Sequence, residues 1–158
     1  MPHLHSPHPS RRGLSAMGVA TLLAVFAVVI VITISSLRGI AIQENESHVQ
    51  ALLEALGKSW SSEVHAAPPE SLKQLAESDA SLERELNDSR WSGENLFRHG
   101  YLVKLVETSE GPTFVAWPSS HPNTGTRSFT WSPETGLQEL ETPKGPFSGL
   151  EHAPKLGD

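Results

Sequence analysis

The side chains able to do chemistry in this sequence are histidines, serines and acids that lie around a predicted sheet. A hydrolase would need a nucleophilic hydroxyl, a histidine base and an acid to orient it. Residues of these types are Ser119, Ser120, His99, His121 and Asp88. A chain with eight histidines and many serines offers such triplets by chance, and none has the spacing of a known catalytic motif. The sequence therefore assigns no catalytic residue.

More histidines lie at the N-terminus, where His3, His5 and His8 alternate with prolines. A metal site needs fixed geometry and further ligands, and no carboxylate lies nearby. The chain has no cysteine, which excludes disulfides, zinc–thiolate sites, iron–sulfur clusters and cysteine nucleophiles. We therefore expect a disordered tail over residues 1–12 and no cofactor.

Charge is spread unevenly along the 158 residues. The first 38 contain three arginines and no acid, whereas the rest contain nine basic and eighteen acidic side chains. An acidic surface repels phosphate backbones, so we expect no nucleic-acid partner. The length suits one domain plus an anchor.

An apolar segment without charges separates Arg12 from Arg38. Residues 14–36 hold about the 20 apolar residues that a helix needs to cross a hydrocarbon core of roughly 30 Å. A lone strand in lipid would leave its backbone groups unpaired, so the segment is expected to be a transmembrane helix. Small residues along it could let two helices approach closely. These are Gly18, Ala20, Ala24 and Ala27.

Two export signals are alternatives to a permanent anchor. Residues 39–41 pass as a signal-peptide cleavage site, and residues 10–14 partly resemble a twin-arginine signal. The apolar run is longer than that of a signal peptide, which favours the anchor. Because two arginines precede the segment and one follows it, we expect a cytoplasmic N-terminus and a domain outside the cytoplasm.

The helical pattern is expected to continue beyond the membrane. Apolar residues recur at three- and four-residue spacing over residues 37–59, with Gly57 as the predicted stop. Acids such as Glu46 are expected on the other, solvated side of this continuation. Residues 60–69 predict a linker, and residues 70–88 predict a second, amphipathic helix.

The pattern then predicts an antiparallel sheet within a domain that covers residues 60–141. Runs of β-branched and aromatic residues alternate with Gly- and Pro-containing turns. We expect about four strands, at residues 101–106, 113–117, 126–131 and 137–140. The tail, residues 142–158, is expected to be irregular. The predicted fold class is α+β, with a long N-terminal helix, a second short helix and a small antiparallel sheet.

Aromatic side chains in these strands are expected to form the core rather than a ligand platform. By strand alternation, Phe129 and Trp131 share one face, together with Arg127. The five aromatic residues are Tyr101, Phe114, Trp117, Phe129 and Trp131.

The order of these parts resembles the architecture of type IV pilins and type II secretion pseudopilins. The sequence RRGL at residues 11–14 resembles a prepilin leader that ends in glycine before an apolar run. The sheet region is similar to that of some bacterial pilin-like proteins in four short motifs. These are GY at residues 100–101, AWP at 116–118, GTRSF at 125–129 and ETG at 134–136.

The resemblance implies that a prepilin peptidase cleaves between Gly13 and Leu14, so that residues 1–13 are a cytoplasmic leader. It implies a structural role at the inner membrane, with the bilayer, further copies of the chain or other pilin-like subunits as partners. The family usually has a glutamate at the fifth mature position, where this chain has Gly18. The alternative is a membrane-tethered binding or sensor domain with no role in filaments, and a tethered enzyme ranks third.

Overall fold

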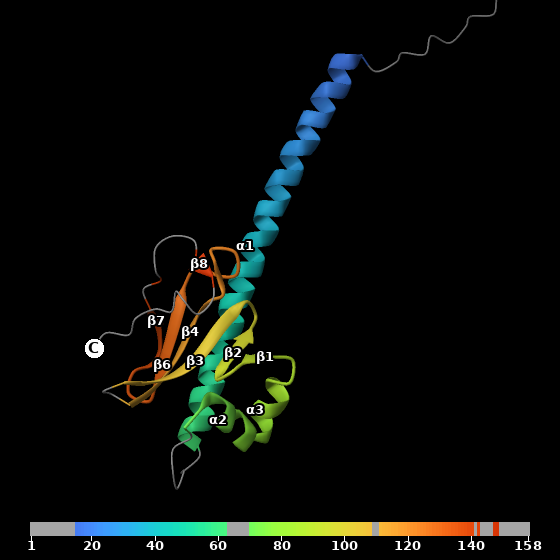
Figure 1. The fold of residues 1–158 in the computed structure, drawn as a ribbon. Coiled ribbons are helices and arrows are strands. Elements are labelled where there is room, and N and C mark those ends of the chain that lie inside the picture. The colour runs from blue at the N-terminus through green and yellow to red at the C-terminus, as the bar shows by residue number, and fades with distance from the viewer. Residues whose placement is uncertain (1–14, 63–69, 109–110, 141, 143–146, 149–158) are drawn as a thin grey trace, which may run out of the picture. The chain divides into compact units, whose positions relative to one another are not determined.

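The longest element is a single helix, α1 (Ala16–Ser62), of 47 residues (Figure 1). The computed structural model describes residues 15–62, 70–108, 111–140, 142 and 147–148. The Oγ of Ser15 accepts a hydrogen bond from the backbone N–H of Gly18 at 3.2 Å, so it caps one of the amides that the first turn leaves unpaired. The predicted long N-terminal helix is confirmed.

The chain divides into two compact units, Met1–Leu37 and Arg38–Asp158. In the first unit the large apolar side chains of α1 are exposed. Among the described residues, α1 is the one helix long and apolar enough to cross a bilayer, and none of its most apolar stretch is buried. So large an exposed apolar surface is unfavourable in water and suits contact with lipid.

In the second unit, α1 packs against a sheet through a row of buried leucines (Figure 1). Leu52, Leu53 and Leu56 are almost wholly buried, and each contributes about 2 kcal/mol of hydrophobic stabilisation. Contrary to the prediction, Gly57 lies inside the helix, which continues to Ser62. A Cβ added at Gly57 would lie 2.0 Å from Cε2 of Trp131, so the glycine serves a close contact and not a helix end.

The second helix predicted over residues 70–88 is two shorter helices, α2 (Leu72–Ser78) and α3 (Ala80–Glu85). Asp79 lies between them, and its carboxylate accepts the backbone N–H of Ser81 at 2.8 Å and caps α3. Hydrogen bonds, of which the one from the Ser81 hydroxyl is the strongest, lower the pKa of Asp79 to about 2. Capping at Asp79 therefore interrupts the predicted single helix.

Six strands form one antiparallel sheet in the order β1-β2-β3-β4-β6-β7 (Figure 1). They are β1 (Arg90–Ser92), β2 (Asn95–Arg98), β3 (Tyr101–Thr108), β4 (Gly111–Pro118), β6 (Ser128–Ser132) and β7 (Gly136–Leu140). A separate pair joins β5 (Ser120–His121) to β8 (Phe147–Ser148). The predicted α+β class and antiparallel sheet are confirmed.

The strand count differs from the predicted four for physical reasons. The added strands β1 and β2 have three and four residues, too few for a clear alternation of side chains. The predicted strand at residues 126–131 begins only at Ser128, because the backbone N–H groups of Thr126 and Arg127 bond to a side chain of α1. In addition, β8 lies in the tail that was expected to be irregular.

The sheet carries an apolar cluster on each face. The face toward α1 includes Tyr101, Phe114 and Phe129, with the half-buried Trp131 packed beside them. Strand alternation places Leu102, Val115 and Trp117 in a cluster on the opposite face. The expectation that the aromatic residues belong to the core is confirmed.

Candidate functional site

The residues proposed for helix–helix contact lie on the apolar part of α1. Ala20, Ala24 and Ala27 are exposed and follow the three- and four-residue spacing of one helix face. Gly18 is half-exposed and, by the same spacing, lies on the opposite side. The proposed cleavage residues, Gly13 and Leu14, are outside the described residues.

In the second unit the connection between β4 and β6, residues 119–127, lies against α1, and we call it the latch loop. Its main partner is Glu46. This residue was expected on the solvated side of the helix, but that prediction is wrong, because its side chain is only 4% exposed. One carboxylate oxygen accepts the backbone N–H and hydroxyl of Thr126 at 2.9 and 2.8 Å. The other accepts Nε and Nη2 of Arg127 at 2.7 and 2.5 Å. Glu46 thus holds the end of the latch loop against the helix.

The ionisation of Glu46 strengthens this contact. Burial opposes the charged form, but the hydrogen bonds from Thr126 and Arg127 outweigh burial and lower the pKa of Glu46. Arg127 is partly exposed and also approaches Glu139 of β7, with 3.6 Å between Nη1 and Oε2. Breaking a buried ion pair of this kind is costly, because the charged group that remains would have no partner.

Two further contacts hold the latch loop on α1. Nδ2 of Asn45 donates to the carbonyl oxygen of Thr124 at 3.0 Å, and the Arg38 guanidinium donates to Oδ1 of Asn123. The stretch of α1 from Arg38 to Glu46 is therefore held by polar contacts. The stretch beyond it is held by the apolar core.

Tyr101 of β3 also holds the latch loop in place. Its ring is fully buried, and its hydroxyl donates to the carbonyl oxygen of Arg127 at 2.8 Å. A Cβ added at Gly125 would lie 2.1 Å from that hydroxyl, so only glycine fits. Burial raises the pKa of Tyr101, which keeps the hydroxyl protonated as a donor. The GY and GTRSF motifs therefore meet in one set of contacts.

The β2–β3 turn meets α1 beside the latch loop. His99 and Gly100 have φ of 47° and 72°, the positive values that a tight two-residue hairpin requires. The Gly100 carbonyl accepts both the backbone N–H and the hydroxyl of Ser119, each at 2.8 Å. The ring of His99 lies against that of His48 on α1, with centroids 4.4 Å apart. Turn, helix and latch loop thus converge.

The His99 ring is held in its neutral form. Its Nε2 accepts Nε–H of Arg98 at 3.1 Å. Burial, followed by the charges of His48 and Arg98, lowers the pKa of His99, although Glu44 and Glu85 act in the opposite direction. His99 is therefore an acceptor at neutral pH.

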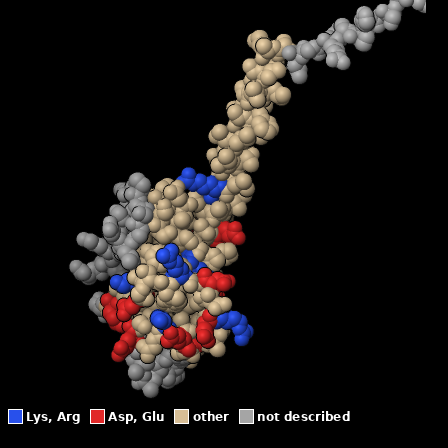
Figure 2. All heavy atoms as spheres, turned by 45° about the vertical axis from the view of Figure 1, so that its right-hand side comes forward, with Lys and Arg blue, Asp and Glu red and all other residues tan. Residues whose placement is uncertain are grey.

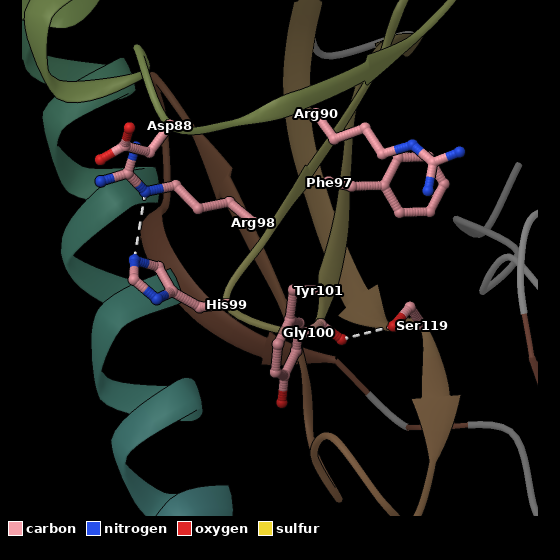
Figure 3. Close-up of a pocket in the computed structure, with 8 residues that line it drawn as sticks. All are labelled: Asp88, Arg90, Phe97, Arg98, His99, Gly100, Tyr101 and Ser119. Atoms are coloured by element: carbon pink, nitrogen blue, oxygen red, sulfur yellow. Dashed lines mark hydrogen bonds between the residues drawn. The ribbon is translucent and has the colours of Figure 1, made fainter.

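A pocket of about 390 Å³ opens beside this turn (Figure 3). Its lining residues are Asp88, Arg90, Phe97, Arg98, His99, Gly100, Tyr101 and Ser119. Arg90 and Phe97 lie on one side of it, and Asp88, Arg98 and His99 on the other (Figure 3). Two guanidinium groups make it a candidate site for an anion.

Three of the five hydrolase candidates reach this pocket, namely Asp88, His99 and Ser119. The other two, Ser120 and His121, form β5 instead. The Ser119 hydroxyl donates to the Gly100 carbonyl, and His99 accepts from Arg98. Each group is therefore bonded to a different partner. The arrangement lacks the base–nucleophile contact that covalent catalysis needs.

Sequence reasoning missed the role of Glu46 although a signal was present. Glu46, Val49, Leu53 and Leu56 are separated by three or four residues, which puts the acid on the buried face. An acid on such a face needs a buried partner, and Arg127 was the residue already placed beside the aromatic face. Cζ of Arg127 lies 5.8 Å from the ring centroid of Phe129, as that placement implied.

No protein-family model, curated protein or solved structure matches this chain.

Proposed function

We propose that this protein is a membrane-anchored structural protein of the type IV pilin or type II secretion pseudopilin kind. The observation that supports it is α1, which contains an exposed apolar stretch and, further along the same helix, a stretch packed on an antiparallel sheet. An exposed apolar helix needs lipid or another helix to cover it, and small residues let helices pack closely within the bilayer. No catalytic step is part of this role.

The proposed location is the inner membrane, with one crossing and a cytoplasmic N-terminus. Arg11 and Arg12 before the apolar stretch outnumber Arg38 after it, which favours this orientation. The proposed partners are the bilayer, other copies of the chain and other pilin-like subunits. Because Gly18 replaces the usual glutamate of the family, we propose that lateral contacts use the face of Ala20, Ala24 and Ala27.

Disulfide crosslinking in native membranes tests this role, since the chain has no cysteine of its own. Ala27→Cys lies on the proposed contact face, and Val29→Cys lies two residues on and so points to the other side of the helix. We expect mild oxidation to crosslink the Ala27→Cys variant to a second copy or to another membrane protein. The Val29→Cys variant should remain uncrosslinked. Equal crosslinking at both positions, or none at either, would contradict an assembly role.

The second candidate function is a membrane-tethered binding domain. The observation that favours it is the pocket with Arg90, Arg98 and His99. Inorganic phosphate is a suitable probe, because guanidinium groups bind phosphate oxygens directly. A rise in melting temperature with phosphate that Arg90→Gln abolishes would favour this function, whereas an unchanged melting temperature would remove it.

A further inference from the structure

We infer that the latch loop faces the bilayer surface and binds phospholipid headgroups beside Arg38. This inference rests on the proposed membrane anchoring and adds a second membrane contact, made by the folded unit itself. Its first support is chain connectivity. Arg38 follows the last residue of the apolar unit directly, so an anchored chain holds it in the headgroup layer.

The contacts of Arg38 then bring the loop to the same depth. Arg38 belongs to the second unit, and its guanidinium donates to Oδ1 of Asn123 within that unit. The hydrogen bond from Asn45 to Thr124 also holds the loop. Asn45 lies seven residues beyond Arg38, which is about 10 Å along α1. Asn123 must therefore lie within a side chain's reach of the membrane boundary, whatever the tilt of the unit.

Charge favours the same face. Residues 111–133 contain no acid, although the rest of the second unit is strongly acidic. Glu46 beside the loop is buried and paired with Arg127, and the nearest exposed acid on α1 is Glu44, about 9 Å beyond Arg38. On the face shown in Figure 2, most acidic side chains gather at the lower end of the second unit. The exposed Glu139 of β7 approaches the loop, but Arg127 lies 3.6 Å from it and offsets its charge. The loop itself contains no acid and is thus the part that an anionic bilayer repels least.

Arg38 also has the chemistry that phosphate needs. It is exposed and carries five N–H donors in a planar fork, only part of which Asn123 can occupy. The remaining donors suit a lipid phosphate. The exposed Pro122 and Asn123 offer a small, uncharged surface beside it.

Depth-dependent fluorescence quenching tests the inference on the full chain in phosphatidylglycerol–phosphatidylethanolamine vesicles. Three single cysteines would carry an environment-sensitive dye: Ser120→Cys in the latch loop, Val29→Cys in the anchor and Glu134→Cys as the control. The Ser120 side chain lies beside Asn123, so this label leaves the bond from Arg38 to Asn123 in place. Glu134 lies in the β6–β7 turn near Trp131, which contacts Gly57, about 30 Å along α1 from Arg38. Tryptophan fluorescence would check that each variant is folded.

We expect a headgroup-located nitroxide lipid to quench the dye at position 120 several-fold more than the dye at position 134. An acyl-chain nitroxide should quench only position 29. Adding Arg38→Gln to the loop variant should reduce the headgroup quenching. If position 29 is quenched but position 120 behaves like position 134, the inference fails while anchoring stands. If position 29 is not quenched by the acyl-chain nitroxide, the anchoring and this inference fail together.

Discussion

At Glu46 a single carboxylate organises a loop that is 80 residues away in the sequence. Its two oxygens accept hydrogen bonds from Thr126 and Arg127, and that is why β6 begins at Ser128 and not at residue 126. The local sequence predicts a strand at residues 126–131. Its first two residues are not in the strand, because their backbone N–H groups donate to the buried carboxylate of Glu46. The spacing of Glu46 places it on the buried face of α1, but a pattern of neighbouring residues does not show which distant donors it meets.

Glu46→Gln should destabilise the second unit, because an amide nitrogen cannot accept the hydrogen bonds of Arg127. We expect the free energy of unfolding to fall by about 3 kcal/mol, in the range for hydrogen bonds to a charged group. Urea unfolding of the full chain in detergent micelles, followed by tryptophan fluorescence, measures it. Glu54→Gln, at an exposed position of the same helix, should change stability by less than about 0.5 kcal/mol. Equal losses in the two variants would show that Glu46 is not a special contact.

His99 should make stability depend on pH. Its pKa is lowered in the folded protein, so the folded chain binds a proton less readily than the unfolded chain. Stability is therefore complete above the unfolded pKa of about 6.5 and falls as the pH drops below that value. A further loss should begin below the ordinary glutamate pKa of 4.5, because the pKa of Glu46 is lowered too.

The variant His99→Asn isolates the first of these two steps. Asparagine tolerates the positive φ of this turn and does not titrate. Unfolding free energies measured at intervals between pH 7 and pH 5 should fall less steeply for the variant than for the parent protein. Parallel curves over that range would assign the pH dependence to other groups.

At the scale of elements, the sequence predicts kinds better than boundaries. The long helix and the antiparallel sheet follow from strong apolar periodicity. The misplaced boundaries are at Gly57 and Asp79, where intrinsic propensity predicts the wrong structural role for the residue. Gly57 is a site of contact with Trp131 instead of a helix stop, and Asp79 is a cap that divides one predicted helix into two. Both roles depend on neighbours in space or on capping geometry.

Gly57→Ala tests the packing of α1 on the sheet. The new methyl group would meet the Trp131 indole at 2.0 Å, and overpacking of this kind costs about 1–3 kcal/mol. Gly39→Ala is the matched control, since a Cβ there meets nothing within 4 Å. Calorimetry in micelles should show a lower melting temperature for Gly57→Ala and an unchanged or slightly higher one for Gly39→Ala. The contact is unimportant if both variants melt with the parent protein.

At the scale of the whole molecule, the sequence predicts the fold class and the long apolar helix, and much less of the site. The apolar stretch and the α+β class can be read from composition and periodicity. The latch loop could not, because Glu46, Tyr101, Gly125 and Arg127 come from three separate segments. The motif residues that carried the pilin resemblance include three of these four. In this chain those three residues share one set of contacts with Glu46.

The central proposal, a processed membrane protein of the pilin type, is tested most directly by the intact mass of the protein after purification from native membranes. We predict the mass of a chain that begins at Leu14, because a leader peptidase would remove residues 1–13. The mass of the uncleaved chain, 17.1 kDa, would contradict the account. It would leave an ordinary anchor, and the tethered binding domain would then be the better description of the protein.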